Sequence, residues 1–145
     1  MRTFSKIQGL AALRIGYGLG PVELVEVLQK TRQPFNANAV AQAGALAGLE
    51  DEEHLRRTKE ITDTGRAYLE EQFARMGLEF VKGCGNFIMV RVGGPGDGKR
   101  IFLALQKRGV IIRDLTSYHL PEYIRVTIGT PAQNARFIEE LGKVI

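Results

Sequence analysis

Near the start of the chain stands Thr3-Phe4-Ser5-Lys6, and three residues after Lys6 begins Gly9-Leu10-Ala11-Ala12-Leu13-Arg14-Ile15-Gly16-Tyr17. A lysine thus follows a hydroxyl residue, and an arginine comes eight residues after that lysine. Lysine attacks carbonyl groups well when burial or a neighbouring charge lowers its pKa. A hydroxyl and a guanidinium separated by a short loop can grip a phosphate through charge-assisted hydrogen bonds. The stretch therefore predicts a site for a ligand that carries both an aldehyde and a phosphate.

Pyridoxal 5'-phosphate (PLP) is the cofactor with both of these groups. Lys6 is then a candidate Schiff-base lysine, and Ser5 and Arg14 are candidate phosphate ligands. Plainer interpretations exist, because a lone Lys6 would usually lie on the surface and Arg14 could form a structural ion pair.

The segment from Arg2 to Tyr17 resembles the lysine segment of fold-type I PLP enzymes, and within them the histidinol-phosphate aminotransferase family of the class II aminotransferases. Ile7-Gln8 departs from the commoner Ala-Tyr or Ala-Phe, which bears only on packing near the cofactor. Later stretches resemble further motifs of the family in the expected order: Arg32-Gln33-Pro34-Phe35-Asn36, Gly85-Asn86-Phe87, Gly109-Val110-Ile111-Ile112-Arg113-Asp114, and Tyr123-Ile124-Arg125-Val126-Thr127-Ile128-Gly129-Thr130.

The resemblance implies roles for individual residues. Lys6 would form the Schiff base with PLP, while Ser5 and Arg14 would bind its phosphate. Arg125 would take the α-carboxylate of the substrate, and Arg113 would contact the distal phosphate of the substrate. Arg125 lies between Ile124 and Val126, so in a strand its side chain points away from theirs, toward a cleft or solvent. A structural ion pair for Arg125 and a solvated strand end for Arg113 stay open as alternatives.

The function implied by the resemblance is PLP-dependent transamination between glutamate and imidazole-acetol phosphate, a late step of histidine biosynthesis. The substrates would be small amino and oxo acids, and the enzyme a homodimer. A complete member of the family is more than twice as long, so the chain resembles a C-terminal fragment that we expect to be inactive by itself. Two alternatives are an enzyme of the same branch with another amino-acid substrate, and a non-catalytic truncated fragment.

Composition narrows the remaining classes of function. Of 145 residues, 44% are hydrophobic and 25% are charged, as in an ordinary soluble globular protein. The net charge is +4, but acidic and basic residues are interspersed with no block of five like charges, which favours a mixed solvated surface over a nucleic-acid surface. A single cysteine excludes an internal disulfide, and neither His54 nor His119 has metal-ligand spacing. Since no apolar run reaches about 20 residues, we expect no membrane partner and a cytoplasmic location.

The pattern of elements predicts an α/β fold with two parts. Residues 1–40 would be the remnant of a large PLP-binding domain with the lysine segment, and residues 41–145 a long linking helix and a small C-terminal α/β domain. Residues 22–28 and 39–49 should carry partly uncovered apolar faces, which predicts aggregation or dimerisation. Gly93–Gly98 should be a turn. The expected helices cover 21–30, about 38–47, 51–76, 99–108 and 133–144. Their candidate caps are Asn36 or Asn38, Asp51 and Thr130, and Pro131 suits the first turn of the last helix. The expected strands cover 2–5, 16–19, 78–81, 87–92, 110–113 and 124–128.

Overall fold

The computed structural model describes residues 1–145, which divide into two compact units, Met1–Lys59 and Glu60–Ile145. One helix, α3 (Glu52–Arg75), begins in the first unit and ends in the second. The mixed helices and strands agree with the predicted α/β class. The assignment of residues 1–40 to a large-domain remnant stays a prediction.

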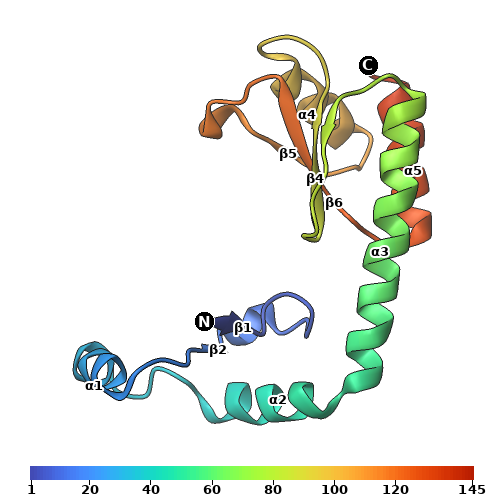
Figure 1. Ribbon diagram of the computed structural model, residues 1–145. Helices are drawn as coiled ribbons and strands as arrows, with labels where there is room; N and C mark the ends of the chain where they lie inside the picture. Colours follow the sequence, from blue (N-terminus) through green and yellow to red (C-terminus); the bar gives the residue numbers. More distant parts are fainter. The chain divides into compact units, whose positions relative to one another are not determined.

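The second unit contains an antiparallel sheet of four strands in the order β3-β4-β6-β5 (Figure 1). The central pair, β4 and β6, aligns Met89 with Arg125, and β6 and β5 align Arg125 with Arg113. These three residues therefore form one row across the sheet. The strands are β3 (Phe80–Val81), β4 (Phe87–Arg91), β5 (Arg113–Asp114) and β6 (Tyr123–Thr127).

Three helices cover one face of this sheet: the C-terminal part of α3, α4 (Asp97–Lys107) and α5 (Pro131–Gly142). Alternation along the strands turns one set of side chains toward these helices. The core that results consists of Leu69, Phe73, Ile88, Val90, Val92, Ile101, Leu105, Ile124, Val126, Phe137 and Leu141. The three helices do not cover the opposite face of the sheet. The residues on that face are Phe87, Met89, Arg91, Tyr123, Arg125 and Thr127.

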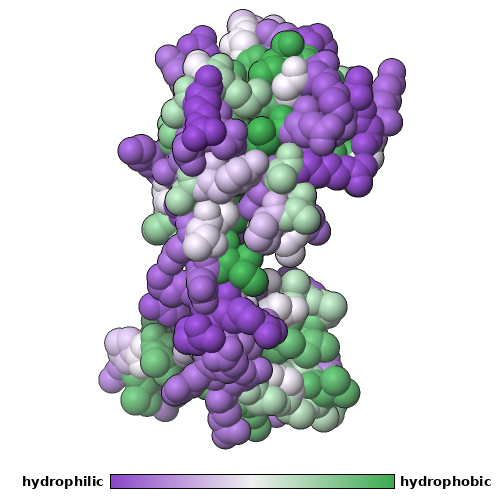
Figure 2. Space-filling model, turned by 90° about the vertical axis from the view of Figure 1, so that its right-hand side faces the viewer, coloured by the Kyte–Doolittle hydropathy of each residue, from purple (hydrophilic) through white to green (hydrophobic).

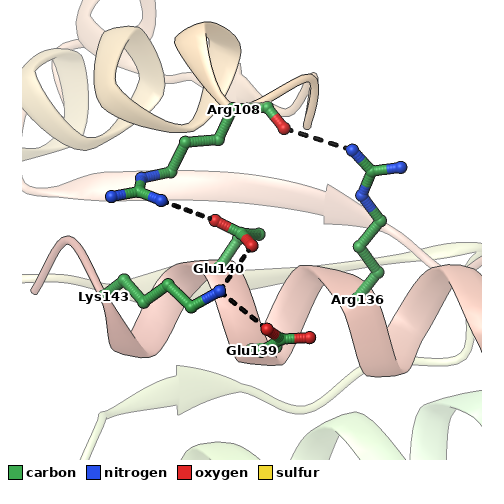
Figure 3. Close-up of polar contacts among 5 residues, drawn as sticks. All are labelled: Arg108, Arg136, Glu139, Glu140 and Lys143. Carbon is green, nitrogen blue, oxygen red and sulfur yellow. Dashed lines mark hydrogen bonds and ion pairs between the residues drawn. The ribbon is translucent and has the colours of Figure 1, made fainter.

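The ends of α4 and α5 are joined by charged side chains (Figure 3). Arg108 Nη1 lies 3.1 Å from Glu140 Oε2, and Lys143 Nζ lies 2.7 Å from carboxylate oxygens of both Glu139 and Glu140. Arg136 donates to the carbonyl oxygen of Arg108 at 3.2 Å, which holds the C-terminal end of α4. At its other end, α5 starts with the expected cap, where Thr130 and Gln133 form a capping box and Pro131 occupies the first turn.

The first unit consists of a two-stranded ribbon and helices. Strands β1 (Arg2–Thr3) and β2 (Gly16–Tyr17) pair antiparallel and enclose the lysine segment. A 3-10 turn, η1 (Ala11–Leu13), lies between them, and α1 (Val22–Thr31) and α2 (Ala39–Glu50) follow. Asn38 caps α2, and Asp51 accepts from the His54 amide at the start of α3, as the sequence predicted.

Apolar side chains of this first unit are largely exposed. No residue of α1 is buried, and in α2 only Ala41 and Ala45 are. The predicted uncovered faces are therefore confirmed. Figure 2 shows hydrophobic surface, coloured green, on this unit. The large exposed apolar residues of α1 and α2 are Val22, Leu24, Val25, Val27, Leu28, Val40, Leu46 and Leu49.

Several predicted boundaries are wrong by a few residues; the last helix, for example, begins at Pro131 and not at residue 133, and three of the expected strands are shorter. Two of the differences have a clear physical cause. Helix α4 begins at Asp97 and not at Lys99, because Asp97 Oδ2 accepts from the Gly94 amide and organises the glycine-rich turn as a helix start. The strand predicted at 110–113 is β5 at Arg113–Asp114, because the Val110 amide donates to the carbonyl of Leu105 and completes the end of α4 instead. No helix has both the length and the apolar content needed to cross a membrane.

Candidate functional site

The lysine turn, residues 4–10, is anchored by its first residue and folded by backbone hydrogen bonds. Phe4 is buried, its amide donates to the Ile15 carbonyl, and its own carbonyl accepts from Leu10. The Gly9 amide donates to the carbonyl of Lys6 at 2.9 Å, with Gly9 at a positive φ of 72° that favours glycine. The turn therefore presents Lys6 as an exposed side chain next to a buried anchor.

Ser5 and Arg14, the two predicted phosphate ligands, line the same open groove of about 430 Å³. Thr3 Oγ1 accepts from the Ser5 amide at 3.1 Å, and Arg14 donates to the Ala11 carbonyl at 2.9 Å. Arg14 adopts the left-handed conformation with φ 53°, where η1 ends. The Ser5 and Arg14 residues thus line one groove, although Lys6 is not among the residues that line it.

Small residues of α2 allow the lysine turn to approach this helix closely. A Cβ added to Gly44 would lie 2.9 Å from Leu13 Cδ1, and one added to Gly48 would lie 3.5 Å from Gln8 Cγ. The buried Ala41 and Ala45 lie on the same helix. Spacings of three and four residues place all four small residues on one side of α2.

Arg113 and Arg125 lie directly opposite each other on β5 and β6, on the sheet face turned away from the core. The Arg125 guanidinium carbon lies 5.0 Å from the centre of the Phe87 ring, and that of Arg113 lies 5.4 Å from the centre of the Tyr118 ring. Such cation–π contacts hold a guanidinium in place without neutralising it.

The charges of this arginine pair are incompletely compensated. Like charges on directly opposite residues of an antiparallel pair destabilise it. Arg125 Nε is buried and has no hydrogen-bond partner. Asp114 follows Arg113, and its pKa is lowered mainly by hydrogen bonds from Thr116, with smaller charge contributions from Lys99 and Arg113. The arrangement is suited to an anion that approaches the helix-free face of the sheet.

The predicted site residues thus form two groups. Ser5 and Arg14 meet in the first unit next to Lys6, and Arg113 and Arg125 meet in the second. Sequence reasoning did not find the aromatic partners Phe87 and Tyr118. The sequence did indicate the direction of Phe87, because alternation along its strand places it on the same face as Met89. Tyr118 carried none, because only the fold of the loop brings it to Arg113.

Comparison with known proteins gives a consistent result. The family model described as aminotransferase class I and II matches residues 1–141. The histidinol-phosphate aminotransferase of Akkermansia muciniphila is 51% identical over 145 residues, which are 100% of this chain and 39% of that protein. The chain therefore spans about two fifths of the length of this curated relative.

Solved structures show the same fold. The histidinol-phosphate aminotransferase of Sinorhizobium meliloti in complex with pyridoxal 5'-phosphate superposes with a TM-score of 0.88 at 28% identity, over 99% of this chain and 39% of that one. The L-threonine-O-3-phosphate decarboxylase of Porphyromonas gingivalis gives a TM-score of 0.76 at 23% identity, covering 97% of this chain and 44% of that one, and this similarity shows the fold alone.

Proposed function

Because the chain belongs to the class I and II aminotransferase family, we propose that it carries the lysine segment and the substrate-binding sheet of a PLP-dependent transaminase. The reaction would exchange an amino group between glutamate and imidazole-acetol phosphate in histidine biosynthesis. The 51% identity to a histidinol-phosphate aminotransferase supports this substrate assignment. The activity would belong to a longer protein, of which this chain would be the C-terminal part.

The residues present fit the cofactor. Ser5 and Arg14 line one groove and would bind the phosphate, and the exposed Lys6 would bind the aldehyde carbon through Nζ. When bound, PLP supplies an electron sink for the bonds at the substrate Cα. Lys6 Nζ would then carry the proton between the substrate Cα and the cofactor carbon. The other predicted site residues of this chain would bind and orient the cofactor and the substrate.

The observation that carries the proposal is the buried, unpartnered Nε of Arg125 beside Arg113. A guanidinium binds a carboxylate through two parallel hydrogen bonds, which lysine does not reproduce. The proposed substrate carries both a carboxylate and a phosphate. Arg125 would take the carboxylate and Arg113 the phosphate, so that two anionic groups compensate two neighbouring cations.

The test is to complement the chain with the missing part. We would co-express it with the portion of the Akkermansia muciniphila relative that it does not match, and assay transamination of imidazole-acetol phosphate with glutamate. We expect activity that disappears in Lys6→Ala. Arg125→Lys should lower kcat/KM by about 10- to 100-fold, because a charge-assisted hydrogen bond contributes about 1.5–3 kcal/mol.

Two controls make this test decisive. The C-terminal part of the relative itself, paired with the same N-terminal portion, must restore activity. If it does and this chain does not, the proposal is wrong. Arg113→Gln should weaken the reaction of histidinol phosphate but not that of histidinol, which lacks the phosphate. An equal effect on both would favour an enzyme of the same branch with another substrate.

A second candidate is a non-catalytic chain that associates through its first unit. The exposed apolar residues of α1 favour it, since Val22 is 69% and Leu28 57% exposed. Size-exclusion chromatography with added PLP separates the two candidates. A colourless protein without PLP in its peak would favour the second, and a yellow protein that loses its colour in Lys6→Ala would favour the first. We also propose that the complete enzyme is a homodimer, which the same apolar surface supports, and that it is cytoplasmic.

A further inference from the structure

One hydrogen bond connects the lysine turn to the start of α3. His54 Nε2 lies 2.9 Å from the carbonyl oxygen of Ile7, although 47 residues separate the two in the sequence. Because a carbonyl only accepts, Nε2 carries the proton and donates it. The imidazole is half-buried, and the hydroxyl of Thr58 lies 3.4 Å from the same nitrogen.

The carbonyl that His54 binds belongs to Ile7, the residue that follows Lys6. On the N-terminal side, Ser5 connects Lys6 to the buried anchor Phe4, and the Lys6 carbonyl accepts from Gly9. The tip of the turn is otherwise weakly held, since the Ile7 side chain is 38% exposed. The His54 bond therefore restrains the part of the turn that packing leaves free.

His54 itself is well placed to act as a fixed donor. Its backbone amide donates to Asp51 Oδ1 at 2.9 Å, which fixes the first turn of α3. On the other side of the turn, the Gln8 side chain is in van der Waals range of the position that a Cβ of Gly48 would occupy. The turn thus lies between a close contact with α2 and a hydrogen bond from α3.

We propose that His54 is a positioning residue for Lys6, acting through the carbonyl of Ile7. It fixes the Ile7–Gln8 peptide, which adjoins the peptide that follows the Cα of Lys6, and so restricts the directions that the Lys6 side chain samples. The restraint on the turn is independent of any cofactor. Its importance for the chemistry of Lys6 rests on the function proposed above.

A matched pair of variants tests the restraint. In His54→Gln the side-chain nitrogen reaches about as far as Nε2, whereas in His54→Asn it reaches only about as far as Nδ1. Amide hydrogen exchange of Gly9, which donates to the Lys6 carbonyl, is the reporter and is read by NMR on the chain as it is. We expect exchange roughly 5- to 10-fold faster in His54→Asn, as for the loss of one net hydrogen bond, and close to the original rate in His54→Gln.

Several outcomes would overturn the proposal. These are unchanged exchange at Gly9 in both variants, equal acceleration in both, or equal acceleration of every amide in residues 1–59, which would mean a loss of general stability. Circular dichroism shows that each variant is folded, and His54→Gln serves as the rescue.

A second readout links the restraint to Lys6. The chain is treated with PLP and borohydride, and peptide mass spectrometry measures the trapped adduct at each lysine. His54→Asn should reduce the adduct at Lys6 several-fold relative to the other lysines, and His54→Gln should restore it. Unselective labelling of the original chain would count against the proposed role of Lys6, while the exchange experiment would still decide whether His54 holds the turn. Selective labelling of Lys6 that both variants leave unchanged would overturn the positioning role.

Discussion

The two units bury their apolar side chains very differently. In Glu60–Ile145, three helices close one face of a four-stranded sheet, and core residues such as Phe73 and Leu105 are 0% exposed. In Met1–Lys59, α1 has no buried residue and α2 buries only two alanines. The second unit therefore has a core of its own, whereas the first is held by local turns, caps and close backbone contacts.

This contrast separates two kinds of site. The arginine pair lies on a sheet whose other face is fully packed, so the positions of Arg113 and Arg125 are set by strand register. The lysine turn has one buried anchor, Phe4, and depends on hydrogen bonds for the rest of its shape. We therefore expect substitutions to act mainly on stability in the second unit and mainly on local order in the first.

The largest expected effect compares two phenylalanines. Phe73 is 0% exposed in the core, and Phe35 is 98% exposed in the first unit. Phe73→Ala removes a buried ring and leaves a cavity, which costs about 3–5 kcal/mol. Phe35→Ala should change the free energy of unfolding by less than about 0.5 kcal/mol. Urea unfolding followed by circular dichroism measures both.

A large effect at Phe35 would contradict its exposure. If Phe35→Ala destabilises the protein as much as Phe73→Ala, the exposed ring must be covered in solution, and a second copy of the chain is the cover to test. Repeating the unfolding at several protein concentrations decides this, because only a dimer has a concentration-dependent midpoint.

Helical glycines provide the next comparison. A Cβ on Gly98 would lie 2.7 Å from the backbone oxygens of both Pro121 and Tyr123 in the second unit. Backbone atoms do not move aside easily, so Gly98→Ala should destabilise by about 1–3 kcal/mol. A Cβ on Gly48 would meet only side-chain atoms at 3.5 Å or more. Gly48→Ala should therefore be neutral or stabilise by up to about 1 kcal/mol, because alanine favours helix.

Thermal unfolding of the two glycine variants checks this pair. A large loss in Gly48→Ala would show that the contact between the lysine turn and α2 is tighter than the first unit's open packing suggests. A neutral Gly98→Ala would mean that the loop around Pro121 can shift, and that the second unit is less closely packed than its core indicates.

Much of the fold followed from local signals. Asn38, Asp51 and Thr130 cap helices as predicted, because their side chains accept from the free amides of the first turn. Two errors have different causes. The start of α4 depends on a local hydrogen bond, in which Asp97 accepts from the Gly94 amide three residues earlier. The position of β5 depends on a tertiary contact, its pairing with β6, which is not visible in the chain order.

For the candidate site, the sequence indicated which residues could take part but not which other residues lie next to them. The outward direction of Arg125 followed from strand alternation and is confirmed, since Ile124 and Val126 are buried. The cross-strand position of Arg113 was not predictable, because register is set by the whole sheet. His54 appeared unimportant in the sequence, since a contact across 47 residues leaves no periodic signal.

The smallest expected effect concerns the charges that join α4 and α5. The pKa of Glu140 is lowered from its usual 4.5, mainly by the hydrogen bond from Lys143, with Arg108 adding to it. In the unfolded chain this carboxyl has its usual pKa, so its ionised form stabilises the fold above about pH 4.5. This contribution is lost as the pH falls through the lower pKa of the folded state. Glu140→Gln should therefore be less stable than the original chain at neutral pH, and this difference should shrink below pH 4.5.

The urea midpoints of the original chain and Glu140→Gln, measured from neutral pH down to acid, test this dependence. Glu26→Gln is the control on α1, where no ion pair is formed, and its difference from the original chain should be small and flat with pH. Because surface ion pairs are screened by salt, the Glu140 difference should also fall at high ionic strength. The stability difference between the original chain and Glu140→Gln could instead be independent of both pH and salt. That result would show that the two helices are held by apolar packing alone, since only an ionised pair responds to both.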